Sequence, residues 1–174
     1  MVTSLLQTHA EFPWLALVNA ASPWVTTAFV AGALQSRLST AVWVGVVATT
    51  VQVVAYYVTA DLRGFGVSMS YVVLWSLCAL AGGPVFGAAG HVWWRASPAG
   101  VGAALLVAAY ASEALVVYYV RLGYFSSAWL FGTIALLLAV GLGWHRRQHP
   151  ALARWLLPAF IAGVAGHTAL GLVL

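Results

Sequence analysis

The stretch "YASEALVVYYVRLG", residues 110–123, places a glutamate inside a long apolar run. The run covers about residues 99–121, and about 20 predominantly apolar residues are enough for a helix to cross the hydrocarbon core of a bilayer. Glu113 is one of only three acidic residues among 174. A carboxylate at membrane depth usually faces a bundle interior or a cavity. The stretch therefore predicts a membrane-spanning helix with Glu113 turned toward other helices.

The rest of the chain has the same composition. Hydrophobic residues make up 63% and charged residues 6%, whereas soluble domains carry about 25% charged residues. This excludes a soluble domain and predicts an all-α, polytopic membrane protein, with residues 1–174 as a single transmembrane domain. We expect six spans, at about 13–35, 40–60, 69–94, 99–121, 126–145 and 151–173.

The arginines predict the orientation of this bundle. Those that flank the first, third and fifth breaks between spans have no acidic neighbours: Arg37, Arg95, Arg146, Arg147 and Arg154. Cytoplasmic loops of membrane proteins are enriched in Lys and Arg. We therefore expect these breaks to be cytoplasmic and both termini to lie outside, in a multi-pass protein of the plasma (inner) membrane. The arginines are scattered singly, so the positive net charge does not indicate a nucleic-acid partner.

Three polar side chains are expected at nearly the same depth. Gln52, Glu113 and His167 each lie about six to eight residues, or roughly 9–12 Å, before the outer end of a span that runs outward. Tyr56 shares a helix face with Gln52, and Tyr110 shares one with Glu113. We expect the Glu113 carboxylate to reach the second or sixth span. The set predicts a polar, aromatic-walled pocket, with Asp61 and Arg63 above it.

Each of these residues also has a simpler interpretation. Tyrosines near span ends are common interfacial anchors, and Gln52 is the kind of residue that bonds across membrane helices. Asp61 and Arg63 fit an exposed loop pair. Glu113 fits a buried ion pair or hydrogen bond with no ligand.

Residues within the first and third spans suggest special roles for those helices. In "FPWLALVNAASPWVTTAF", residues 12–29, the first span contains Asn19 and Pro23. Proline disrupts a helix interior, so we expect a break at Pro23 that leaves Asn19 or Ser22 facing the bundle interior, with Asn19 as a pocket residue. The third span contains the glycine-rich segment Gly82–Gly90. Small residues favour close helix contacts, so this segment predicts either internal packing or a docking face for another membrane protein.

The sequence predicts neither a metal nor a cofactor. Cys78 is the only cysteine, which excludes a Cys-x-x-Cys site. A haem between two histidines is a weaker alternative, because His91, His145 and His149 fall at the cytoplasmic face and His167 near the opposite one. No motif for hydrolase or nucleotide chemistry is found.

The segments "ASPWVTTAFVAGAL" (21–34), "YYVTADLRG" (56–64) and "ALAGGPVFGAAGHVWWR" (79–95) carry a family resemblance. The chain resembles small multi-span actinobacterial membrane proteins known as a domain of unknown function, over most of residues 1–150. In that family a further helix precedes the segment that matches "TSLLQ", so we expect such a helix upstream. A looser architectural likeness is to the substrate-capturing subunits of energy-coupling-factor vitamin transporters. Neither likeness assigns a catalytic residue.

These observations favour a transport-type protein that captures or translocates a small, partly aromatic or cationic solute from outside. One alternative is a structural or accessory subunit of a larger membrane complex. Another is a membrane enzyme that uses Glu113 and His167 as acid and base, which requires the two groups within one water of each other.

Overall fold

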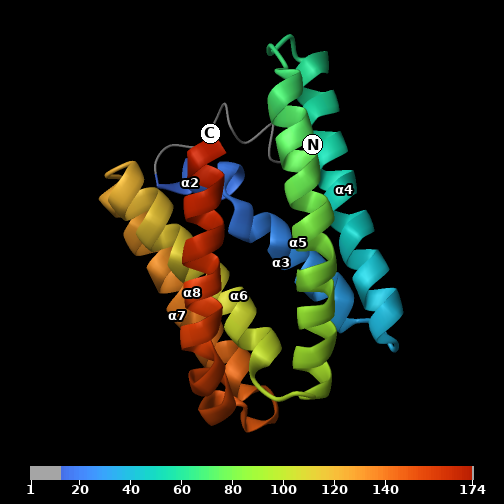
Figure 1. The fold of residues 1–174 in the computed structure, drawn as a ribbon, viewed down its shortest axis with the longest axis vertical. Coiled ribbons are helices and arrows are strands. Elements are labelled where there is room, and N and C mark those ends of the chain that lie inside the picture. The colour runs from blue at the N-terminus through green and yellow to red at the C-terminus, as the bar shows by residue number, and fades with distance from the viewer. Residues whose placement is uncertain (1–12, 174) are drawn as a thin grey trace.

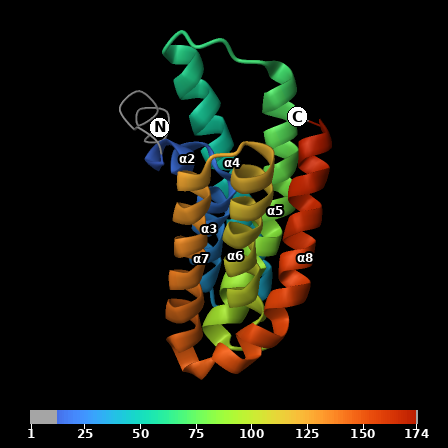
Figure 2. The ribbon, with the colours of Figure 1, turned by 90° about the vertical axis from the view of Figure 1, so that its left-hand side faces the viewer.

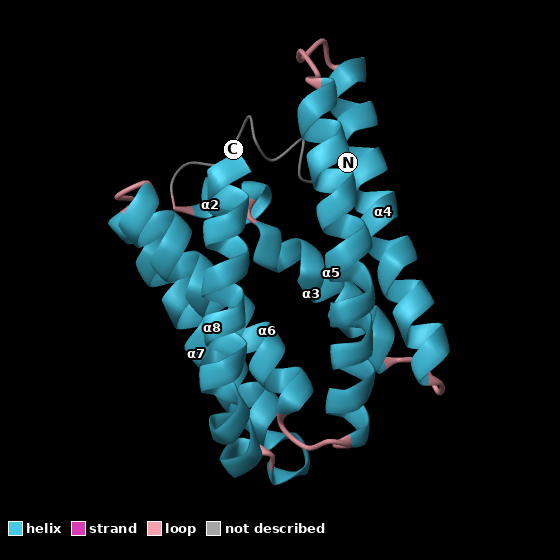
Figure 3. Ribbon diagram, viewed as in Figure 1, coloured by secondary structure: helices cyan, strands magenta, loops and turns pink. Residues whose placement is uncertain are grey.

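The computed structural model describes residues 13–173, and this part of the chain is helical with no strand. Its elements are α2 (Trp14–Asn19), α3 (Ala21–Ala33), α4 (Leu38–Leu62), α5 (Met69–Arg95), α6 (Val101–Ser112), the π-helix η1 (Glu113–Arg121), α7 (Phe125–Trp144), the 3-10 turn η2 (His145–Arg147) and α8 (His149–Val173). Short turns join the helices at both ends of the bundle (Figure 3).

Within residues 13–173, five helices are long and apolar enough to cross a membrane. They cover Leu38–Leu62, Met69–Arg95, Val101–Arg121, Phe125–Arg147 and His149–Val173. The predicted all-α, multi-span membrane protein is confirmed. The count of six spans is not, because the first predicted span folds as two shorter helices, α2 and α3.

The first span is interrupted at Ala20 rather than at Pro23. Ala20 has an extended backbone (φ −87°, ψ 151°) between α2 and α3. Pro23 lies in the first turn of α3, where backbone N–H groups have no intrahelical acceptor, so a residue without an N–H is tolerated there. The predicted break at Pro23 is therefore not confirmed, although the span is broken close to it.

The helices form two groups with α3 between them (Figure 1). α4 and α5 pack along each other, while α6 contacts α7 and α8 in the second group. α3 contacts α4, α5 and α6, and it runs obliquely from the α2 end of the molecule toward the opposite end. Figure 2 shows the second group from its outer side, with α6 between α7 and α8. The obliquely placed α3 thus contacts both groups, which also contact each other directly through α5 and α6.

The glycine-rich segment of α5 is an internal contact. A Cβ on Gly87 would overlap the backbone of Ala41 in α4, and one on Gly90 would overlap the carbonyl of Phe29 in α3. Only glycine lets these backbones approach so closely. The Gly82–Gly90 segment therefore contributes to packing within the chain, and its buried glycines do not form the free docking face that the accessory-subunit hypothesis required.

The three breaks that the arginines flank meet at one end of the bundle. Arg95 donates through Nη2 to the carbonyl of Ser36 at 2.9 Å, and Arg146 donates through Nη1 to the carbonyl of Arg95 at 3.2 Å. The loops after α3, α5 and η2 thus lie together, as a bundle of alternating helices requires. That this end is cytoplasmic stays a prediction from the positive-inside rule.

Candidate functional site

Glu113 holds the beginning of α3. Its carboxylate accepts the backbone N–H of Ala21 through Oε1 at 2.9 Å and that of Ser22 through Oε2 at 2.9 Å. The Ser22 hydroxyl donates to the same Oε2 at 2.5 Å. The first N–H groups of a helix lack intrahelical acceptors, and negative charge is favoured at that end. Glu113, only 4% exposed, therefore caps α3 from across the bundle.

The hydrogen-bond partners of Glu113 lie on a span that the sequence did not point to. We expected the carboxylate to reach the second or sixth span, and its hydrogen-bond partners lie instead on the first. The positions of Gln52, Glu113 and His167 within their spans place them at one depth. Position within a span does not determine which helix the first span contacts. The break at Ala20 leaves backbone N–H donors without intrahelical acceptors near Glu113, and these donors bind the carboxylate.

The π-helix η1 begins at Glu113 and brings a second side chain to the broken helix. Tyr118 donates its hydroxyl to the carbonyl of Ala16 in α2 at 3.2 Å. Short π-helical insertions are frequent at functional sites, and this one extends from Glu113 to Arg121. One segment of the second helix group therefore holds both α2 and α3.

Gln52 and Tyr110 connect helices to α3. Gln52 donates through Nε2 to Thr27 Oγ1 at 2.5 Å and to the carbonyl of Trp24 at 3.3 Å. The Tyr110 hydroxyl lies 3.0 Å from Thr26 Oγ1. Neither residue lines the cavities described below. Their contacts match the simpler interpretation of hydrogen bonds between helices.

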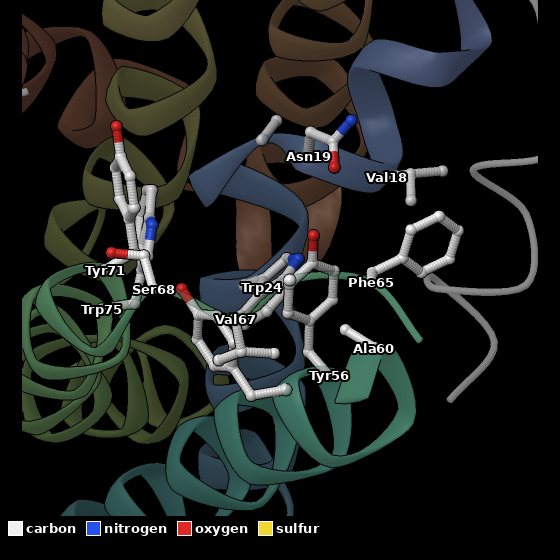
Figure 4. Close-up of a pocket in the computed structure, with 13 residues that line it drawn as sticks. Val18, Asn19, Trp24, Tyr56, Ala60, Phe65, Val67, Ser68, Tyr71 and Trp75 are labelled. Atoms are coloured by element: carbon white, nitrogen blue, oxygen red, sulfur yellow. The ribbon is translucent and has the colours of Figure 1, made fainter. Parts of the chain in front are cut away.

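A cavity of about 550 Å³ lies between the α2–α3 break and the α4–α5 hairpin. We call this the aromatic cavity, because six of its lining side chains are aromatic. They are Trp24, Tyr56, Tyr57, Phe65, Tyr71 and Trp75. Figure 4 shows Trp24 and Tyr56 near the centre of the view, with Tyr71 and Trp75 on one side and Phe65 on the other. The volume falls within the range of about 300–1,000 Å³ for small-molecule sites.

A smaller cavity of about 290 Å³ lies on the other side of the break. It is lined by residues that include Glu113, Arg121 and His167. Asn19 and Trp75 line both cavities and therefore stand between them. Of the predicted site residues, the structure thus places Asn19 and Tyr56 at the aromatic cavity, and Asn19, Glu113 and His167 at the smaller one.

Asp61 and Arg63 lie at the end of α4 and line neither cavity. Asp61 is exposed, while the guanidinium carbon of Arg63 lies 5.0 Å from the centroid of the Phe65 ring. This is within the distance of about 6 Å at which a cation is attracted to an aromatic face.

Sequence reasoning missed most of the aromatic wall. Trp24, Phe65, Tyr71 and Trp75 were not among the predicted site residues. Tyr71 and Trp75 are four residues apart in α5 and so share a helix face, which was a usable signal. Phe65 joins them from the loop between α4 and α5, and Trp24 joins them only because α3 packs against α4 and α5.

Trp24 also carries a polar group that the described residues leave unused. Its indole Nε1 is buried and has no hydrogen-bond partner in the described part of the chain. Buried donors are normally satisfied, so this N–H is an exception within the described part of the chain.

Comparison with known proteins assigns a family without an activity. No curated protein and no solved structure matches the chain. The likeness to energy-coupling-factor subunits and the actinobacterial origin accordingly remain expectations. A family model does match, over residues 1–174. The chain therefore belongs to a family of unknown function, DUF6518.

Proposed function

We propose that this membrane protein binds a small solute in the aromatic cavity, as a capture or transport protein of the plasma membrane. The observation that carries the proposal is a cavity of about 550 Å³ at a broken helix, with aromatic walls contributed by α3, α4 and α5. Broken helices that line ligand sites are a recurrent feature of transporters.

The position of the cavity fits capture from outside. It is lined by the loop between α4 and α5, at residues 65–68, and this loop lies at the opposite end of the bundle from the turn that carries Arg95 (Figure 1). Under the positive-inside rule the arginine-rich end is cytoplasmic. The cavity then belongs to the outer half of the protein.

The predicted site residues take different roles in this proposal. Tyr56 and Asn19 contact the solute directly. Glu113 acts indirectly, because both of its oxygens already accept hydrogen bonds from α3. It holds the beginning of α3 at the break between α2 and α3, and this break shapes one wall of the cavity.

The acid–base enzyme alternative has less support. Glu113 and His167 do line the same smaller cavity. The carboxylate, however, accepts three hydrogen bonds at 2.5–2.9 Å, so both of its oxygens are already occupied by the first turn of α3. A group held in this way is poorly placed to exchange a proton with a substrate.

Ligand-dependent thermal stabilisation of the protein in lipid nanodiscs tests the proposal. A panel of small amines, amino acids, sugars and carboxylates is screened against wild type, Tyr71→Ala and Tyr119→Ala. Tyr71 lines the aromatic cavity, whereas Tyr119 lines neither cavity and has a similar exposed fraction, 54% against 48%.

We expect at least one solute to stabilise wild type and Tyr119→Ala but not Tyr71→Ala. Stabilisation that survives Tyr71→Ala would place the binding site elsewhere. A panel with no Tyr71-dependent ligand would contradict the proposal.

A further inference from the structure

We propose that the aromatic cavity selects an organic cation, whose charged group binds against the aromatic wall. This inference rests on the proposed function and names its solute class. The wall consists of Trp24, Tyr56, Tyr57, Phe65, Tyr71 and Trp75. Aromatic faces carry negative electrostatic potential, and sites for quaternary ammonium groups are built from several such rings.

The ring geometry suits a compact cation. Trp24 and Tyr56 have centroids 5.6 Å apart and an interplanar angle of 62°, while Tyr56 and Tyr57 are 5.2 Å apart at 88°. Rings that stand at such angles direct their faces along different axes. A cation in contact with several of these rings would therefore meet ring faces that point in different directions. Parallel stacked rings would offer it only one face.

The described residues that line the aromatic cavity carry no formal charge that would repel a positive guest. None of the described residues that line it is an arginine, a lysine or a histidine, whereas Arg121 and His167 line the smaller cavity. Ala60, in the last turn of α4, lines the aromatic cavity, and the C-terminal end of a helix carries partial negative charge.

The positive end of α3 does not oppose this preference. Ala20, at the start of that helix, lines the cavity. The backbone N–H groups of the next two residues are covered by the carboxylate of Glu113. Glu113 thus offsets the positive end of α3, whereas α5 also begins at the cavity, at its N-cap residue Ser68.

The wall already contacts one cation of the chain itself. Arg63 lies 5.0 Å from the ring centroid of Phe65, although it does not line the cavity. The described lining contains no carboxylate, and hard metal cations require several oxygen ligands. An organic cation, which needs no such ligands, fits the wall better than a metal ion does.

The test uses two probes that differ in one atom. Choline carries a quaternary nitrogen, and 3,3-dimethyl-1-butanol replaces that nitrogen with carbon and is neutral. Binding of both to the full chain in nanodiscs is measured by titration calorimetry. We expect choline to bind at least about tenfold more tightly, a difference of about 1.4 kcal/mol.

Two substitutions of Tyr56 distinguish the effect of its aromatic face from the effect of its side-chain volume. Tyr56→Phe keeps an aromatic face, so choline affinity is expected to stay within about threefold of wild type. Tyr56→Leu keeps an apolar side chain without a ring face, so choline affinity is expected to fall at least about tenfold. The same change should leave the affinity for 3,3-dimethyl-1-butanol within about threefold.

The outcomes are distinguishable from those of the proposed function. If both probes bind wild type with equal affinity and lose that binding in the Tyr71→Ala variant, the preference for a cation would be overturned. A solute site in the aromatic cavity would still be supported by this result. Binding of neither probe would also overturn the inference, and the wider solute panel would then decide the proposed function. Choline binding that is unchanged in Tyr56→Leu would show that the cation binds outside the aromatic wall.

Discussion

The Glu113 carboxylate lies 2.9 Å from the backbone nitrogen of Ser22, a residue 91 positions earlier in the chain. This contact joins the second helix group to the first turn of α3. A glutamate in a membrane span requires a partner, because placing an uncompensated charge at the bilayer centre costs about 2.5–3.5 kcal/mol on insertion scales. Here the partner is the backbone of a broken helix.

The first prediction concerns the charge of Glu113. Glu113→Gln nearly preserves the side-chain size, but the amide has one acceptor oxygen where the carboxylate has two, and its NH₂ group would face a backbone N–H donor. We expect the free energy of unfolding in detergent to fall by about 1–3 kcal/mol, seen as a lower melting temperature. Asp61→Asn, the same change at an exposed position, serves as the control. Equal melting temperatures for Glu113→Gln and wild type would contradict the capping role.

A second prediction tests the contact itself through a double-mutant cycle. Ser22→Ala removes the hydroxyl that donates to Glu113 Oε2, and a hydrogen bond to a charged group contributes about 1.5–3 kcal/mol. We expect Ser22→Ala to be destabilising alone and to cost much less when Glu113 is already glutamine. The four unfolding free energies give the coupling energy directly. Additive effects would mean that the two side chains do not interact.

The third prediction concerns the close approach of α4 and α5. A Cβ at residue 87 would overlap the backbone of Ala41, so Gly87→Ala must push the two helices apart. We expect a loss of about 1–3 kcal/mol in unfolding free energy, typical of overpacked cores. Gly132→Ala is the matched control, because a Cβ there would meet no atom within 4 Å. Similar stability of both variants would contradict the tight α4–α5 interface.

The fourth prediction concerns orientation. In a Cys78→Ser background, a cysteine at the exposed position Ser97, next to Arg95, should resist a membrane-impermeant thiol reagent added to intact cells. A cysteine at the exposed position Ser126, at the other end of the bundle, should react. The reason is the preference of arginine-flanked turns for the cytoplasm. Labelling of Ser97→Cys from outside would reverse the topology and place the aromatic cavity in the inner half.

Composition and periodicity were sufficient for the helical membrane fold. Long apolar runs can satisfy their backbone groups in a bilayer only as helices or closed barrels, and each run has the length of a membrane helix. The burial of Glu113 followed from the same cost argument, and Tyr56 and Asn19 do line the aromatic cavity. These features depend on local sequence and on the bilayer, so they could be predicted without knowing which helices contact each other.

The partners of those residues were decided by tertiary structure alone. The oblique path of α3 depends on the close contacts of the α5 glycines with Phe29 and Gly32, and that path determines which donors Glu113 meets. It also brings Trp24 beside Tyr56, residues that lie 32 positions apart and on different helices. Periodicity reports which face of a helix is buried, but the choice of neighbour depends on side-chain and backbone fit summed over the whole bundle. The sequence by itself therefore determined the helices and the buried charge, and only the packing of α3 against its neighbours created the aromatic cavity.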